Sequence, residues 1–245
     1  MNIALIGHGK MGAEIEQVAL SKGIGVKKIF TAANNRGGKA LTRESLRGVD
    51  VCVEFSAPSA AVKNINAVAE AGIPLVVGTT GWYDQLGAVK NIIDTRGTGL
   101  VYSPNFSVGI NLLSHLINCA AHLFDKCEMY DVAIRETHHR GKEDSPSGTA
   151  LHLSQLLLRS MRRKDSIVAG NPDGKIRPGQ LNISSVRLGS AVGEHAVIFD
   201  SEADSLEFIH RAKNRSGFAH GALIAAEWIR GKKGVYTMED VLTTD

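Results

Sequence analysis

The feature that most constrains the fold of this chain is a glycine-rich turn near its beginning. An apolar segment, Asn2–Ile6, leads directly into Gly7-His8-Gly9-Lys10-Met11-Gly12, and the helical spacing of Ile15, Val18 and Ala19 follows. Between a first strand and a first helix, G-x-G-x-x-G is typical of a dinucleotide-binding unit. Its first glycine permits the tight turn, the second lets a pyrophosphate touch the backbone, and the third lets the helix lie close to the strand. We therefore predict a dinucleotide site here, and the alternative is a glycine turn kept only for packing.

Short apolar runs alternate with helical patterns over the first hundred residues. The runs are rich in valine and isoleucine and do not alternate with polar residues, which is typical of parallel strands buried on both faces. They cover residues 3–6, 26–30, 51–55, 75–77 and 100–102. A helix is predicted over residues 59–71, with Ser59 as its N-cap and with Gly72 and Pro74 ending it. The pattern predicts an α/β fold with a doubly wound, Rossmann-type parallel sheet.

The pattern changes after residue 106. Helices are predicted over residues 107–124 and 147–161, a strand over 130–136, a loop over 170–179, and a final helix over 217–229. Segments 181–188, 195–199 and 206–210 alternate apolar with polar residues, which indicates antiparallel strands with one solvated or interface face. We therefore expect residues 1–106 and 216–245 to form the dinucleotide-binding domain. Residues 107–215 are expected to form an α+β domain with a mostly antiparallel sheet, for substrate binding and oligomerisation.

The composition argues against several classes of partner. The 245 residues carry a formal charge of only +3, and the basic residues are dispersed rather than massed in blocks, which disfavours nucleic acid. No stretch reaches the roughly 18 to 20 uncharged apolar residues of a membrane span, and no signal peptide is recognisable. The three cysteines lack metal-type spacing and suit a reducing compartment, with Cys52 as a small core residue. We expect a cytoplasmic protein with no membrane partner.

The segment after the predicted second strand bears on the choice of cofactor. A carboxylate at this place grips the ribose 2′-hydroxyl in NAD sites, but the chain has Ala33 and Asn34 there. Arg36 and Lys39, together with Lys10, could instead meet a 2′-phosphate, although solvated surface charges explain each of them equally well. The segment favours NADPH, or the use of both NADPH and NADH.

A polar loop in the second half carries candidate chemistry. It reads Glu136-Thr137-His138-His139-Arg140-Gly141-Lys142, and Pro146-Ser147-Gly148-Thr149 follows. Histidine titrates near neutrality and is a natural proton carrier. Adjacent histidines in extended backbone point in opposite directions, so we predict no metal site. The second segment offers a helix cap and free amides where a carboxylate could dock, although a solvated loop before an ordinary capped helix is an equal alternative on these residues alone.

This loop resembles the signature E-x-H-H-x-x-K-x-D-x-P-S-G-T-A of the 4-hydroxy-tetrahydrodipicolinate reductase family. Four further segments, at residues 78–81, 103–109, 187–195 and 208–223, resemble the family's G-T-T-G, A-N-F-S-x-G, R-x-G-x-x-V-G-E-H and I-x-H-x-A-x-x-R-x-x-F-x-x-G-A motifs. The resemblance therefore runs in order along nearly the whole chain. The chain departs from the family pattern at three places. Its glycine turn is one residue shorter, and Ala33 or Asn34 stands where the family has an acidic residue. Glu54 and Ala57 stand where family members often have Asp and Arg.

The resemblance implies reduction of 4-hydroxy-tetrahydrodipicolinate to tetrahydrodipicolinate with NADH or NADPH, in the diaminopimelate route to lysine, by a homotetramer. It implies that His138 and Lys142 are catalytic and that His139, Gly148 and Thr149 bind substrate. The implied cofactor-binding residues are Gly7, His8, Gly9, Lys10, Met11, Gly12, Gly78, Thr79, Thr80, Ser103, Pro104, Asn105 and Phe106.

Two alternatives remain open at this point. One is a related NAD(P)-dependent enzyme acting on another amino or keto acid, such as an aspartate dehydrogenase, which has no evident need for the loop from His138 to Lys142. The other is a nucleotide-sensing binding protein without catalysis, for which the sequence offers no basic recognition helix.

Overall fold

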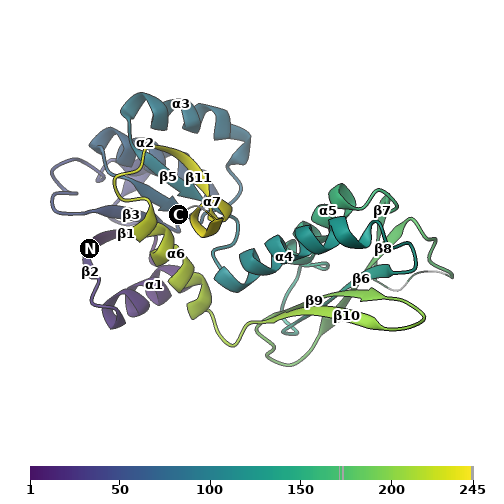
Figure 1. Cartoon of the computed structure of the whole chain (residues 1–245). Coiled ribbons are helices and arrows are strands. Elements are labelled where there is room, and N and C mark those ends of the chain that lie inside the picture. The colour runs from purple at the N-terminus through teal and green to yellow at the C-terminus, as the bar shows by residue number, and fades with distance from the viewer. Residues whose placement is uncertain (171, 173, 244–245) are drawn as a thin grey trace. The chain divides into compact units, whose positions relative to one another are not determined.

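The computed structural model describes residues 1–170, 172 and 174–243, and the chain divides into two compact units. The first unit consists of Met1–Val108 and Arg215–Asp245, and the second of Gly109–Asn214. The final long helix, α6 (Ser216–Trp228), therefore belongs to the first unit (Figure 1).

The first unit is built on a six-stranded parallel sheet with the order β11-β5-β4-β3-β1-β2. Its strands are β1 (Asn2–Ile6), β2 (Gly25–Phe30), β3 (Val51–Glu54), β4 (Leu75–Val77), β5 (Gly99–Tyr102) and β11 (Gly234–Thr237). The first five were predicted from their apolar runs, whereas β11 was not. The predicted Rossmann-type class is confirmed.

Helices cover both faces of this sheet (Figure 1). Helices α1 (Lys10–Ser21), α6 and α7 (Met238–Thr243) share one core with it, and α2 (Pro58–Ala71) and α3 (Leu86–Arg96) share the other. Strands buried on both faces explain the unalternating apolar runs, and Cys52 lies in the core as expected. The prediction that Ser59 caps α2 is wrong. The helix begins at Pro58, with Ala57 as an N-cap that makes no side-chain bond, because proline is preorganised for a first helical position.

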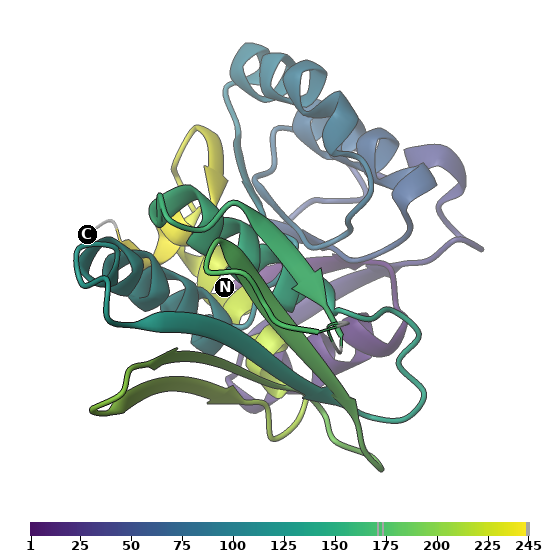
Figure 2. The ribbon, with the colours of Figure 1, turned by 90° about the vertical axis from the view of Figure 1, so that its right-hand side faces the viewer.

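The second unit contains a five-stranded mixed sheet with the order β10-β9-β6-β8-β7. Its strands are β6 (Asp131–His138), β7 (Ser166–Ala169), β8 (Gln180–Arg187), β9 (Glu194–Asp200) and β10 (Ser205–Arg211). Helices α4 (Val108–Phe124) and α5 (Gly148–Ser160) share a single core with β6, β8 and β9 and so cover one face of the sheet (Figure 2).

The expectation of a mostly antiparallel sheet is wrong for β8. Strands β9 and β10 are antiparallel to their neighbours, but β8 runs parallel to both β6 and β7. Alternating polarity reports which face of a strand is covered and carries no information about its direction. Within the described residues, no helix is both long and apolar enough to cross a membrane.

A buried lysine ties together the beginnings of β6 and β8. The side chain of Lys164 is fully buried, and its Nζ donates to Asp131 Oδ1 at 2.6 Å. The same nitrogen donates to the carbonyl oxygens of Pro178 and Gln180, each at 2.8 Å. Lys164 therefore helps to hold in register the two strands whose far ends carry His138 and Arg187.

We predict that Lys164→Met lowers the free energy of unfolding by about 1–3 kcal/mol, because Asp131 and two carbonyl groups lose the donor that the buried Lys164 side chain supplies. Urea unfolding followed by circular dichroism measures this. The control is Lys126→Met, at an exposed lysine whose side chain makes no hydrogen bond observed in the described part of the chain. Equal stability of the Lys164 variant and the wild type would contradict the anchoring role.

Candidate active site

The glycine turn has the geometry that a dinucleotide site requires. Gly7 has a φ of +92°, and a Cβ placed there would collide with the carbonyl of Phe55. A Cβ at Gly12 would collide with the carbonyl of Gly7, whereas one at Gly9 would meet no atom within 4 Å. Gly7 and Gly12 are thus required by the packing of the protein itself, while Gly9 leaves open space at the N-terminus of α1. Free N–H groups and a partial positive charge at such a helix end suit an anion.

A pocket in the first unit brings three of the predicted segments together. Its volume is about 300 Å³, and its lining consists of Met11, Phe55, Gly78, Pro104, Asn105, Phe106, Arg215 and Phe218. The glycine turn, the G-T-T-G segment and residues 104–106 each contribute to it. Phe55, Arg215 and Phe218 were not assigned to the site from the sequence, although the last two lie in the closing family motif.

Two of the predicted cofactor residues, Thr79 and Ser103, are buried polar residues that shape the surrounding loops. Thr79 Oγ1 accepts the backbone N–H of Ser56 at 2.8 Å, and the carbonyl of Thr79 accepts Trp82 Nε1 at 2.7 Å. Ser103 Oγ donates to the carbonyl of Asn105 at 2.8 Å. By contrast, His8, Lys10 and Thr80 are exposed, and His8 Nε2 lies 2.7 Å from Glu16 Oε2.

The loop after β2 is held from inside the protein. Asn34 Oδ1 accepts the N–H of Thr31 at 2.7 Å, so this side chain is engaged within the loop. A buried chain of hydrogen bonds runs from Asn35 Nδ2 to Asn64 Oδ1 (3.1 Å) and from Asn64 Nδ2 to Glu54 Oε1 (3.3 Å). Burial raises the pKa of Glu54. Arg36 and Lys39, in the same loop, are exposed.

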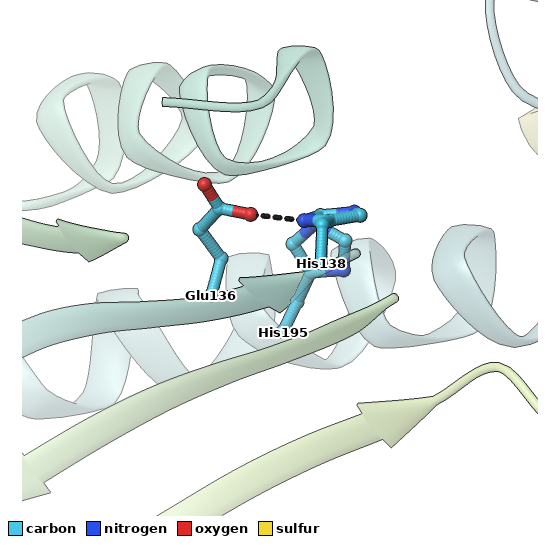
Figure 3. A group of neighbouring side chains, drawn as sticks. All are labelled: Glu136, His138 and His195. Carbon is cyan, nitrogen blue, oxygen red and sulfur yellow. Dashed lines mark hydrogen bonds and ion pairs between the residues drawn. The ribbon is translucent and has the colours of Figure 1, made fainter. Parts of the chain in front are cut away.

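In the second unit, Glu136 and His138 lie two residues apart on β6 and so share one face of the strand. Figure 3 shows the carboxylate of Glu136 bonded to Nδ1 of His138. Arg187 Nη2 donates to the other oxygen, Glu136 Oε1, at 2.9 Å, and the N–H of Ser147 donates to it at 3.4 Å. Burial of Glu136 opposes its ionisation, but hydrogen bonds, including that from Arg187, and the charge of His138 outweigh burial and hold its pKa below the usual range.

A second imidazole, from His195, packs edge-on against His138. His195 lies on β9 in register with Glu136, and the two ring centroids are 5.1 Å apart with an interplanar angle of 69°. Burial lowers the pKa of His195 to about 4, so this ring is neutral at pH 7. Burial also lowers the pKa of His138, against the opposing pull of Glu136. Ser147 Oγ lies 3.1 Å from His195 Nε2 and accepts the N–H of Ala150, as the predicted cap of α5.

Three ligand atoms, one each from Glu136, His138 and His195, lie within 4.8 Å of one another, a spacing that a metal ion could bridge (Figure 3). The guanidinium of Arg187 on the same carboxylate opposes a cation there. That the protein binds no metal ion at this site stays a prediction.

The remaining predicted residues lie in the loop after β6 and at the start of α5. Lys142 N donates to the carbonyl of His139 at 3.1 Å, and Lys142 Nζ pairs with Asp144 Oδ1 at 2.7 Å. Gly148 and Thr149 form the first turn of α5, and a Cβ at Gly148 would meet no atom within 4 Å. The sequence assigned no role to Glu136, Arg187 or His195, although each lies in a segment that resembles a family motif.

Comparison with known proteins places these sites in a family. The model described as "Dihydrodipicolinate reductase, N-terminus" matches residues 1–106, and the model of the C-terminus matches residues 109–242. The 4-hydroxy-tetrahydrodipicolinate reductase of Christiangramia forsetii is 37% identical over 243 residues, which is 99% of this chain and 98% of that protein. The enzyme of the same name from Neisseria meningitidis serogroup B is 36% identical over 197 residues, covering 79% of this chain and 72% of that protein.

Solved structures share the fold. The dipicolinate-bound dihydrodipicolinate reductase from Paenisporosarcina sp. TG-14 has a TM-score of 0.76 at 23% identity, covering 97% of both chains. The amine dehydrogenase from Mycobacterium smegmatis has a TM-score of 0.61 at 12% identity, covering 98% of this chain and 95% of that one. Because the two family models together match almost the whole chain and a relative is 37% identical along its length, this chain belongs to the dihydrodipicolinate reductase family.

Proposed function

We propose that this protein reduces 4-hydroxy-tetrahydrodipicolinate to tetrahydrodipicolinate with a nicotinamide cofactor, with loss of water, in the diaminopimelate route to lysine. The observation that carries the proposal is the position of His138 and Lys142 next to the start of α5, in a chain that belongs to this family. His138 is bonded to a buried carboxylate, and Lys142 lies in the loop that follows it. Helix α5 begins after this loop at Gly148, where a Cβ would meet no atom within 4 Å. The name of the relatives and the dipicolinate bound by the Paenisporosarcina protein support it.

Residues of the first unit are proposed to hold the cofactor. The open space at Gly9 and the N-terminus of α1 suit the pyrophosphate. The pocket lined by Met11, Gly78 and residues 104–106 suits a flat ring. The bound nicotinamide supplies the hydride.

The second unit is proposed to hold the substrate and to supply a proton. The N–H groups of Gly148 and Thr149, with His139 and the charge of Lys142, suit a ring that carries carboxylates. Negative charge grows on the ring as hydride arrives, so an acid must deliver a proton. His138 and Lys142 are the candidates for that acid.

The direct test uses purified protein, NADH or NADPH, and enzymatically generated substrate, with loss of nicotinamide absorbance as the signal. Oxidation of at least one cofactor is expected. No oxidation with either cofactor would refute the proposal, and turnover of L-aspartate with oxidised cofactor would favour the dehydrogenase alternative.

We predict that Lys142→Ala lowers kcat about a hundredfold, the scale of a positioned acid, while the Kd for NADPH stays unchanged because Lys142 belongs to the second unit. Steady-state kinetics and fluorescence titration measure the two quantities. The matched control is Lys126→Ala, at an exposed lysine of the same unit. Undiminished kcat in the Lys142 variant would remove the residue from the catalytic role.

We propose NADPH, or both cofactors, as the hydride donor, because the loop after β2 presents Arg36 and Lys39 and engages Asn34 internally. Arg36→Ala is expected to raise KM for NADPH about tenfold, the effect of losing one charged hydrogen bond, and to leave KM for NADH unchanged. Arg43→Ala, at another exposed arginine, is the control. A similar change with both cofactors would contradict contact with the 2′-phosphate.

The cytoplasmic location and the homotetramer are proposed on the family resemblance. Apolar side chains exposed on β8 and β10, including Val186, Leu206 and Ile209, support contact between subunits. Light scattering should give four times the chain mass of 26.2 kDa, and the mass of a single chain would contradict the tetramer.

A further inference from the structure

We propose that Glu136 is a positioning residue that holds His138 through Nδ1, so that Nε2 of His138 is the atom that exchanges the proton with the substrate. This inference rests on the proposed function, and it goes further by naming the proton-carrying atom and the group that selects it.

The carboxylate of Glu136 is fixed from three sides. It is fully buried, it lies on β6, and its Oε1 accepts Arg187 Nη2 from β8 and the N–H of Ser147 at the start of α5. These contacts leave Oε2 for His138 Nδ1. An ionised carboxylate can only accept hydrogen bonds, so Nδ1 must carry the hydrogen in this pair. The neutral imidazole therefore has its lone pair on Nε2.

The other ring nitrogen of His138, Nε2, is not held by a hydrogen bond from the described residues. Within residues 1–170, 172 and 174–243, no hydrogen bond from the protein to His138 Nε2 is observed. A Cβ built on Gly193 would lie 3.1 Å from this nitrogen, closer than an ordinary contact. Because residue 193 is a glycine, no side chain at this position crowds Nε2 of His138. One nitrogen is held by the protein and the other is left for a ligand.

The neighbouring groups permit His138 to gain and lose a proton in this arrangement. The charges that act on it are Glu136 on β6, Arg187 on β8 and Lys142 in the following loop, and His195 faces it from β9. His195 is neutral at pH 7, so it does not compete for the proton. The negative charge of Glu136 favours the imidazolium and opposes the two positive groups.

The proton balance of the step is simple. The imidazolium breaks its Nε2–H bond, the proton bonds to the substrate, and the electron pair remains on Nε2. The Nδ1–H bond to Glu136 persists throughout, so Glu136 takes up no proton. A proton from solvent then restores Nε2–H for the next turnover.

The tautomer can be tested in the unmodified protein. Protein labelled with ¹⁵N at histidine is examined by long-range ¹H–¹⁵N spectroscopy at pH 8, and His138→Gln identifies the resonances of His138. The expected result is a protonated Nδ1 and an unprotonated Nε2. The opposite tautomer, or a mixture of both, would overturn the proposal. This readout needs no turnover, so its failure is distinguishable from failure of the proposed function.

The positioning role is tested with Glu136→Gln. We expect kcat to fall about a hundredfold, the scale of a general acid, while KM for substrate and the Kd for NADPH change by less than about threefold, well under one charged hydrogen bond. The limb of the pH–kcat profile that reports His138 should move to lower pH, because the lost charge favoured the imidazolium.

The matched control is Glu207→Gln, which removes the same charge from an exposed position on β10 of the same sheet. Its kcat and pH profile should equal those of the wild type. An unchanged kcat in Glu136→Gln would overturn the proposal, and so would an unmoved pH limb or a parallel loss of NADPH binding. If that variant does not fold, the tautomer measured in the wild type decides.

Discussion

The second unit is organised around the burial of one negative charge. A carboxylate removed from water costs several kcal/mol unless donors and positive charge compensate it. Glu136 receives its compensation from Arg187, from His138 and from the N–H of Ser147. These partners come from β8, from β6 itself and from the start of α5. The need to compensate the charge of Glu136 therefore brings three elements together.

The direction of β8 is part of this arrangement. In the parallel pairing of β6 with β8, Arg187 lies in register with His138, two residues beyond the pair formed by Glu136 and Ser185. The guanidinium thereby reaches back to Glu136 Oε1 and also donates to the carbonyl of Asp144. The parallel pairing of β8 with β6 thus places the positive charge of Arg187 next to the buried carboxylate of Glu136.

Much of the first unit could be predicted, because its signals are local. The apolar runs identified five strands, and the glycine turn identified the two close backbone approaches at Gly7 and Gly12. Strand β11 was not predicted because its residues are all half-buried and do not form a run of apolar side chains. The pocket-lining Arg215 and Phe218 lie more than a hundred residues after the other pocket segments, and only tertiary folding gathers them.

The second unit was harder to predict because its signals are not local. The candidate residues His138 and His139 and the cap at Ser147 could be predicted from residue type and spacing. The direction of β8 could not, because alternation describes faces only. The ion pair of Glu136 with Arg187 could not be predicted either, because the two residues are 51 positions apart. The spacing of charged residues in the sequence does not indicate an ion pair between strands.

The low pKa of His195 has a consequence for the whole pair of imidazoles. With a pKa of about 4, only about one molecule in a thousand carries a proton on this ring at pH 7. Two charged rings with centroids 5.1 Å apart would repel each other, and this state is effectively never populated near neutrality. The pair therefore carries at most one exchangeable proton, and the ring that can take it up is the one bonded to Glu136.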